Sequence, residues 1–250
     1  MKILVTGKNG YIARSFAERT RCDLISLRDD TWKNTSFAEY DVILHAAAIV
    51  HKRETRFNRH KYYLINRDLC EDLAKKAKAD GVRQFIFLSS ISVFGINCGV
   101  ISHNTPLNPT THYGRSKLAA ESLLQPLADD NFKIAVLRPP MVYGPDCPGN
   151  YAKLRQMVKA LPIFPNYPNK RSIVGIDNLC GAVNDIIINS KSGIFYPKDP
   201  YPVSTTQMAE NIAAESGKKL KTTTVFNNLI DRTIRFNTIQ KLFGSLVLDI

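Results

Sequence analysis

The sequence lacks any uninterrupted apolar segment approaching the roughly 20 residues that a membrane-spanning helix requires, so no membrane partner is expected. Its N-terminus leads directly into a predicted strand, which predicts that no secretory signal peptide is present. Cysteines are few and odd in number, and no two of them form a close C-x-x-C pair. This usage disfavours both a disulfide framework and a zinc site. We therefore expect reduced thiols, no bound metal and a cytoplasmic location.

The first residues combine a strand, a glycine turn and a helix. Residues 3–5 read as a buried strand and residues 11–20 as a helix, and the turn between them has the pattern G-x-x-G-x-x-A. In this pattern Gly7 permits the tight turn, Gly10 lets the backbone approach a pyrophosphate, and Ala13 allows close packing of helix on strand. The amides at the start of the helix then face an anion. The turn therefore predicts a dinucleotide-binding site.

A strand–helix alternation continues after this turn and predicts a doubly wound α/β fold with a parallel sheet, the Rossmann type. Predicted strands cover residues 23–27, 41–48, 85–88 and 133–137, and predicted helices cover 66–79 and 113–127. Asn66 is interpreted as the N-cap of its helix. Ligands of such sheets bind beyond the C-terminal ends of the strands, where Gly7, Ala46, Ser90 and Pro139 fall. Their shared position predicts one site.

A hydroxyl, a phenol and an ammonium complete this predicted site. Tyr113 and Lys117 are four residues apart and project from one face of a helix. A positive charge near a phenol favours phenolate and lowers its pKa from about 10. Such a tyrosine can take a proton from a sugar hydroxyl or return one to a ketone. The simpler alternatives are an exposed helix pair for Tyr113 and Lys117, and a backbone-capping role for Ser90.

The chain resembles the extended short-chain dehydrogenase/reductases, in their nucleotide-sugar epimerase, dehydratase and reductase branch. The resemblance spans nearly the whole chain. It is carried by residues 6–13 (T-G-K-N-G-Y-I-A), 45–47 (H-A-A), 66 (N), 89–90 (S-S), 93–95 (V-F-G), 113 and 117 (Y and K), 138–145 (R-P-P-M-V-Y-G-P) and 171–179 (R-S-I-V-G-I-D-N-L).

The resemblance implies a role for each matching residue. Ser90, Tyr113 and Lys117 would form the catalytic triad, with Lys117 also binding the nicotinamide ribose. Arg171 would contact a substrate diphosphate, Asn150 would contact the sugar or its phosphates, and Ser90 would contact the reacting oxygen. The cofactor-binding residues would be Gly7, Asn9, Gly10, Tyr11, Ile12, Arg28, Ala46, Ala47, Asn66, Tyr113, Lys117, Pro140 and Val142.

The reaction implied by the resemblance is hydride transfer at C4 of a nucleotide sugar, most similar to UDP-N-acetyl-sugar enzymes of surface polysaccharide biosynthesis. A 4-ketoreductase and a 4-epimerase use the same residues and stay open as alternatives. Dehydration is disfavoured because Ile91 and Ser92 follow Ser90, where a dehydratase has an Asp-Glu pair. A different class, a non-catalytic dinucleotide-binding sensor or assembly subunit, also remains. Family analogy suggests a homodimer.

The choice of nicotinamide cofactor depends on the end of the second strand. An acidic residue there accepts the ribose 2′-hydroxyl of NAD, whereas an arginine accommodates the 2′-phosphate of NADP. Our alignment places Arg28 at this position, and a shift of one residue would place Asp29 there. NADP(H) is therefore favoured over NAD(H).

Positive charge exceeds negative charge, with 34 Lys and Arg against 22 Asp and Glu and a formal net charge of +12. The strongest cluster, residues 51–61, follows the predicted strand that ends at Ala46 and Ala47. Attraction of an anionic sugar nucleotide explains it without nucleic acid, because no helix-turn-helix, zinc or RNA-binding motif accompanies it. A solvated surface explains it equally well.

The length of 250 residues accommodates one Rossmann domain and a smaller lobe. We predict that residues 1–145 form the dinucleotide-binding domain and that 172–205 return to it. Residues 146–171 and 206–250 would form a small substrate-binding lobe. Few residues separate Leu27 from Asp41, so a helix customary in this family is expected to be reduced to a loop there.

Overall fold

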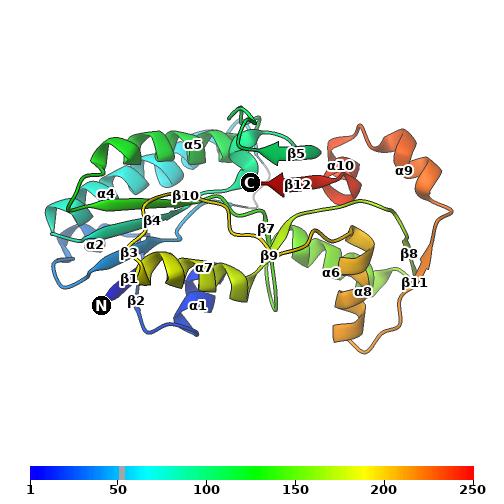
Figure 1. Ribbon diagram of the computed structural model, residues 1–250, viewed down its shortest axis with the longest axis horizontal. Helices are drawn as coiled ribbons and strands as arrows, with labels where there is room; N and C mark the ends of the chain where they lie inside the picture. Colours follow the sequence, from blue (N-terminus) through cyan, green and yellow to red (C-terminus); the bar gives the residue numbers. More distant parts are fainter. Residues whose placement is uncertain (51–53) are drawn as a thin grey trace. The chain divides into compact units, whose positions relative to one another are not determined.

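A computed structural model describes residues 1–50 and 54–250 (Figure 1). The chain divides into two units, each described by itself below. Unit 1 comprises Met1–Gly95, Leu107–Pro140 and Ile176–Pro197, and unit 2 comprises Ile96–Pro106, Met141–Gly175 and Lys198–Ile250. The sequence placed residues 96–106 with the dinucleotide-binding residues. The structure groups them with unit 2 because β5 (Gly99–Ser102) pairs in parallel with β12 (Leu246–Asp249).

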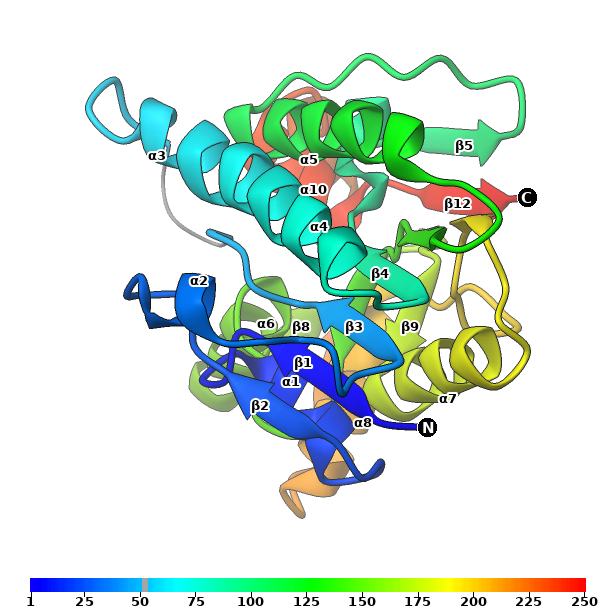
Figure 2. The same cartoon turned by 90° about the vertical axis from the view of Figure 1, so that its left-hand side faces the viewer.

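Unit 1 is built on a six-stranded parallel sheet, which confirms the predicted doubly wound fold class. The strand order is β10-β6-β4-β3-β1-β2, and part of it can be followed in Figure 2. The strands are β1 (Ile3–Thr6), β2 (Asp23–Ile25), β3 (Val42–His45), β4 (Gln84–Leu88), β6 (Lys133–Leu137) and β10 (Gly193–Phe195). The central strands β1, β3 and β4 are buried along their whole length, as expected for a parallel sheet covered on both faces.

Helices cover both faces of this sheet. Figure 1 shows α4 (Leu69–Ala79) and α5 (His112–Leu124) on one face, and α1 (Tyr11–Ala17) and α7 (Ile176–Ile188) on the other. A 3-10 turn, η3 (Gln125–Leu127), continues α5. The short helix α2 (Thr31–Asn34) lies between β2 and β3, where the sequence predicted a loop. It forms because Trp32, only 2% exposed, packs into the core beneath it.

The helix before β4 differs from its prediction. It begins seven residues earlier than expected, as α3 (Arg59–Tyr63), and continues through a π-helical segment η1 (Leu64–Asp68) into α4. Asn66 therefore lies inside the helix, and its interpretation as an N-cap is wrong. The π-helical turn places its side chain, which is fully buried, against other elements of unit 1.

Unit 2 contains three parallel strand pairs and four helices among the described residues. Besides β5 with β12, the pairs are β7 (Met141–Tyr143) with β9 (Ile173–Gly175) and β8 (Ile163–Pro165) with β11 (Lys221–Thr223). The helices are α6 (Asn150–Ala160), α8 (Thr205–Glu215), α9 (Asn227–Thr233) and α10 (Asn237–Phe243). Within the described parts of both units, no helix combines the length and the apolar character needed to cross a bilayer.

Candidate cofactor and catalytic site

The glycine turn packs directly against the end of β3. Gly7 has a φ of +84°, which disfavours any residue with a side chain. A Cβ atom on Gly7 would lie 3.0 Å from both the nitrogen and the Cα of Ala47 and 3.2 Å from the carbonyl carbon of Ala46. The turn is closed by Gly10, whose amide donates to the Gly7 carbonyl at 2.6 Å. Gly7, Ala46 and Ala47 thus meet at one edge of the sheet, as the sequence predicted, in a backbone arrangement that fits a dinucleotide.

His45, at the end of β3, is a buried residue at this edge of the sheet to which the sequence analysis assigned no role. Its Nδ1 lies 2.8 Å from the hydroxyl of Thr6, and its ring stacks on Phe85 and Phe87. Burial and, to a lesser extent, the charge of Lys117 lower the pKa of His45 to about 3, so the ring is neutral at physiological pH. The Nε2 atom has no hydrogen-bond partner among the described residues.

Asn66 fastens the connection that leaves β3. Its Oδ1 accepts a hydrogen bond from the amide of Ile49 at 2.7 Å, and its Nδ2 donates to the carbonyl of Ile49 at 3.1 Å. The same Nδ2 donates to the hydroxyl of Ser116 on α5, also at 3.1 Å. Asn66 therefore joins the residues after Ala47 to the helix that carries Tyr113. Its predicted contact with a cofactor stays a prediction.

Ser90 follows the C-terminal end of β4, and Tyr113 lies in the first turn of α5. The Ser90 hydroxyl accepts from the amide of Ser92 at 3.1 Å and caps the 3-10 turn η2 (Ile91–Phe94). Burial raises the pKa of Tyr113 to about 12, and a hydrogen bond with Ser90 offsets part of this rise. The expectation of a lowered pKa is therefore wrong for this structure, because desolvation of the phenolate outweighs the stabilising contacts.

Lys117 lies one turn along α5 from Tyr113 and is only 2% exposed. Its Nζ donates to the carbonyl of Leu88 at 2.7 Å and lies 4.5 Å from the ring centre of Phe87. Burial lowers the pKa of Lys117 to about 8, although the neighbouring Cys70 and Glu121 raise it. The ammonium of Lys117 is thus hydrogen-bonded to the last residue of β4, two residues before Ser90. The pKa of Tyr113 is set by burial, by Ser90 and by Tyr62.

A buried ion pair distinguishes the two adjacent serines. Ser89 donates its hydroxyl to the carboxylate of Glu121, which also forms an ion pair with Arg138 at 2.6 Å. Arg138 donates further to the hydroxyl of Tyr196 at 2.9 Å. Because Ser89 is committed to this structural network, Ser90 is the serine that faces Tyr113. The sequence contained no local signal for Glu121, since its partners are distant along the chain.

Arg28 and Asp29, which follow β2, differ in the hydrogen bonds that their side chains form. Asp29 accepts hydrogen bonds from the amide and the hydroxyl of Thr31. The side chain of Arg28 is exposed, and the part of the chain that the structure describes offers it neither a hydrogen bond nor an ion pair. Of the two, Arg28 is therefore the side chain that stays available to a ligand.

The predicted substrate residues belong to unit 2. Arg171 is half-buried, its Nη1 donates to the carbonyl of Gly244 at 2.5 Å, and burial lowers its pKa below the usual range. Asn150 is the exposed first residue of α6. Among the described residues no hydrogen bond or ion pair joins the two. Of the basic cluster 51–61, residues 51–53 lie outside the described residues.

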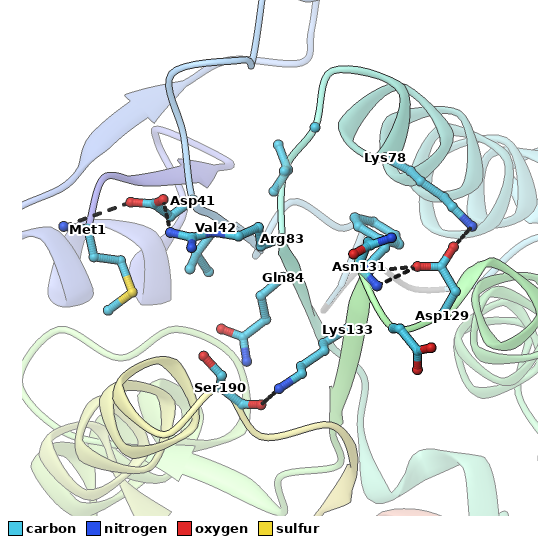
Figure 3. A pocket seen from close by; sticks show the side chains of 14 residues that line it. Met1, Asp41, Val42, Lys78, Arg83, Gln84, Asp129, Asn131, Lys133 and Ser190 are labelled. Carbon is cyan, nitrogen blue, oxygen red and sulfur yellow. Dashed lines mark hydrogen bonds and ion pairs between the residues drawn. The ribbon is translucent and has the colours of Figure 1, made fainter.

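A cavity of about 720 Å³ lies at the other end of the sheet (Figure 3). It is lined by the first residues of three strands, among them Val42, Gln84 and Lys133, and none of the predicted site residues reaches it. A smaller cavity of about 220 Å³ is lined by Ile49, Asn58, Lys61 and Tyr62, beside the connection that Asn66 holds. Only the smaller cavity borders the predicted site.

The solved structures that share this fold include two with a nicotinamide cofactor. The structure of UDP-glucuronic acid 4-epimerase from Bacillus cereus with NAD has a TM-score of 0.74 and 20% identity, and the match covers 100% of this chain and 88% of that one. The structure of dTDP-4-dehydrorhamnose reductase from Bacillus anthracis with NADP has a TM-score of 0.71 and 18% identity, covering 91% of this chain and 85% of that one.

Sequence comparison identifies relatives and a family. UDP-glucose 4-epimerase from Vibrio cholerae is 31% identical over 87% of this chain and 70% of its own length. N-acetyl-alpha-D-glucosaminyl-diphospho-ditrans,octacis-undecaprenol 4-epimerase from Escherichia coli O157:H7 is 27% identical, over 78% of this chain and 60% of its own length. The family model for the NAD dependent epimerase/dehydratase family matches residues 13–163. The chain therefore belongs to the NAD dependent epimerase/dehydratase family, which confirms the resemblance inferred from its motifs.

Proposed function

We propose that this protein is an NAD(P)-dependent enzyme that acts at C4 of a UDP-linked sugar, as a 4-ketoreductase or a 4-epimerase, in surface polysaccharide biosynthesis. The observation that carries the proposal is that the side chains of Ser90 and Tyr113 interact, one helical turn from buried Lys117. A protein that only bound a dinucleotide would have no use for a phenol held against a serine hydroxyl at the sheet edge where such cofactors bind.

The chemistry follows from the protonation states of these side chains. When bound, the nicotinamide supplies or accepts the hydride at C4 of the sugar. In the reductive direction Tyr113 donates its phenolic proton to the carbonyl oxygen on C4, and Ser90 donates a hydrogen bond to the same oxygen. Since the pKa of Tyr113 is raised to about 12, the tyrosine carries this proton at neutral pH. The resting phenol is thus in the state that a reduction requires.

The oxidative direction requires the opposite state of Tyr113. The phenolate must then remove the proton of the 4-hydroxyl group before or as the hydride leaves C4. The hydroxyl of Ser90 is the group that favours phenolate in this structure. A 4-epimerase performs both directions on opposite faces of a 4-keto sugar, whereas a ketoreductase performs only the reduction.

We further propose that NADP(H) is preferred over NAD(H). The glycine turn with Ala46 and Ala47 would hold the pyrophosphate, and Lys117 would bind the nicotinamide ribose. Arg28 would bind the 2′-phosphate, a role supported by its lack of a partner among the described residues and by the engagement of Asp29 with Thr31. A role for Arg171 and Asn150 in binding the diphosphate of the sugar nucleotide follows from the family pattern.

Turnover of a panel of sugar substrates tests the proposal. The panel contains UDP-glucose, UDP-N-acetylglucosamine, their 4-keto derivatives and the undecaprenyl-diphosphate-linked N-acetyl sugar named in the Escherichia coli relative. Sugar products are followed by NMR and the cofactor by nicotinamide absorbance. A ketoreductase oxidises one reduced cofactor per product, whereas an epimerase inverts C4 without net change in absorbance. Cofactor binding without any product across the panel would refute the proposed activity and favour a non-catalytic dinucleotide-binding protein.

A further inference from the structure

The first turn of α5 is held by a carboxylate from a distant part of the chain. The Oε2 atom of Glu54 accepts a hydrogen bond from the amide of His112 at 3.0 Å, and its Oε1 accepts one from the amide of Tyr113 at 2.9 Å. The next amide, that of Gly114, is bound by the hydroxyl of Thr111 at 3.0 Å. Glu54 therefore provides two of the three caps of this helix.

The sequence of α5 does not provide this charge itself. Its first turn contains no acidic residue, and Glu54 precedes the helix by 58 residues. A negative charge at a helix N-terminus is stabilised by the exposed amides and the helix dipole. Hydrogen bonds to a charged acceptor are stronger than those between neutral groups. The tie is therefore strong enough to decide where the first turn of α5 lies.

Glu54 lies on the connection that follows β3, and this connection is fastened to α5 a second time. At its beginning Ile49 is bound by Asn66, which donates to Ser116 on α5. Ala46 and Ala47, which pack against Gly7, immediately precede it. Residues 46–49 therefore contact the glycine turn and, through Asn66, α5, and Glu54 makes a separate contact with the first turn of α5.

One of the two contacts of Glu54 is with Tyr113, the residue whose side chain interacts with Ser90. The amide that Glu54 binds at 2.9 Å belongs to Tyr113, so it restrains the backbone from which the phenol projects. Tyr62 interacts electrostatically with both Glu54 and Tyr113. Burial and then the charge of Glu54 raise the pKa of Tyr62, and Tyr62 in turn raises the pKa of Tyr113. Displacement of a reacting group by about 1 Å can reduce a rate by about 10².

We propose that Glu54 is a positioning residue, which fixes the first turn of α5 and thereby holds the Tyr113 hydroxyl at Ser90 in the orientation needed for proton transfer. This inference rests on the proposed function of Tyr113 and assigns to Glu54 no contact with substrate or cofactor. Its effect is on the chemical step rather than on the binding of the nucleotide.

The Glu54→Gln variant tests this role. A glutamine accepts one of the two hydrogen bonds and places its own NH₂ group against the other amide. We expect kcat to fall about tenfold or more, with the KM for cofactor unchanged. Glu54→Asp keeps the charge but shortens the side chain, and we expect an intermediate kcat.

Asp80→Asn is the matched control. The Oδ2 atom of Asp80 accepts a hydrogen bond from the backbone amide of Phe37 at 2.7 Å and from Lys76 at 2.9 Å, so it also ties distant segments of unit 1. Asp80 is the C-cap residue of α4. We expect this variant to lose stability and to keep the parent kcat.

Hydrogen exchange of the amides of residues 112–114 provides a readout that does not need activity. In Glu54→Gln we expect faster exchange at His112 and Tyr113, whereas Asp80→Asn leaves both unchanged. Unchanged exchange in Glu54→Gln, or a loss of kcat no greater than that of Asp80→Asn, would overturn the role of Glu54. If the parent protein turns over no sugar in the panel, the proposed function fails, and the exchange rates alone decide whether Glu54 holds the helix.

Discussion

Lys117 donates a hydrogen bond from its buried ammonium to the carbonyl oxygen of Leu88 at 2.7 Å. Leu88 is the last residue of β4, two residues before Ser90, so this bond fixes the strand that presents the serine to the helix that presents Tyr113. The geometry of the Ser90–Tyr113 pair therefore depends on Lys117, a charged side chain that is almost fully buried.

The buried ammonium makes folding stability depend on pH. Because burial lowers the pKa of Lys117 to about 8, the folded chain loses this proton above pH 8, while the unfolded chain keeps it until about 10.5. The unfolded state then binds more protons, so the free energy of unfolding rises with pH. Between pH 7 and 9 we expect the parent to gain about 1 kcal/mol relative to Lys117→Met, measured by urea unfolding. A parallel pH dependence in both proteins would contradict the shift.

Breaking the buried ion pair of Glu121 and Arg138 is expected to destabilise unit 1. The side chains are 7% and 5% exposed, so Arg138→Met leaves a buried carboxylate without its cation. We expect a loss of about 3–5 kcal/mol in the free energy of unfolding. Lys191→Met removes an exposed ion pair with Asp185 and is the control, with an expected loss of about 0–1 kcal/mol. Equal losses in the two variants would show that the pair is not buried.

Gly7→Ala is expected to weaken cofactor binding as well as stability. The added Cβ is strained by the φ of +84° and would lie 3.0 Å from backbone atoms of Ala47. Gly81→Ala is the matched control, because Gly81 has a φ of +85° but no atom within 4 Å of the added Cβ. We expect the control to lose about 1–2 kcal/mol of stability. Gly7→Ala should lose more and should bind NADPH more weakly in a fluorescence titration; equal behaviour would contradict the close packing.

The cofactor preference is tested at the end of β2. We expect Arg28→Ala to reduce the affinity for NADPH by about 10–100-fold, the loss of one charge-assisted contact, and to leave the affinity for NADH almost unchanged. Arg21→Ala, at another exposed arginine of unit 1, is the control for the loss of one positive charge. If Arg28→Ala weakens both cofactors equally, Arg28 does not recognise the 2′-phosphate.

Local patterns predicted the parts of the site that depend on neighbouring residues. The glycine turn, the strands that end at His45 and Leu88, and the spacing of Tyr113 and Lys117 could all be predicted in this way. Contacts between distant residues were not. Neither the tie from Glu54 to α5 nor the network of Glu121 and Arg138 leaves a periodic or compositional signal.

The direction of the pKa shift of Tyr113 could not be predicted from local sequence either. The i, i+4 spacing correctly placed Lys117 one turn away, but it could not show how deeply the phenol is buried. Burial dominates and raises the pKa to about 12. Asn66 was similarly misread, because a helix-capping residue type and a buried polar side chain in a π-helical turn look alike in sequence.

The measurement that tests the central claim most directly is turnover by Tyr113→Phe on whichever sugar the parent converts, with cofactor binding measured in parallel. The substitution removes one oxygen atom and keeps the ring in its place. We predict that kcat falls by about 10²–10⁴ while the affinity for the nicotinamide cofactor is retained. Turnover at the parent rate would contradict the account, because proton transfer would then not pass through this phenol.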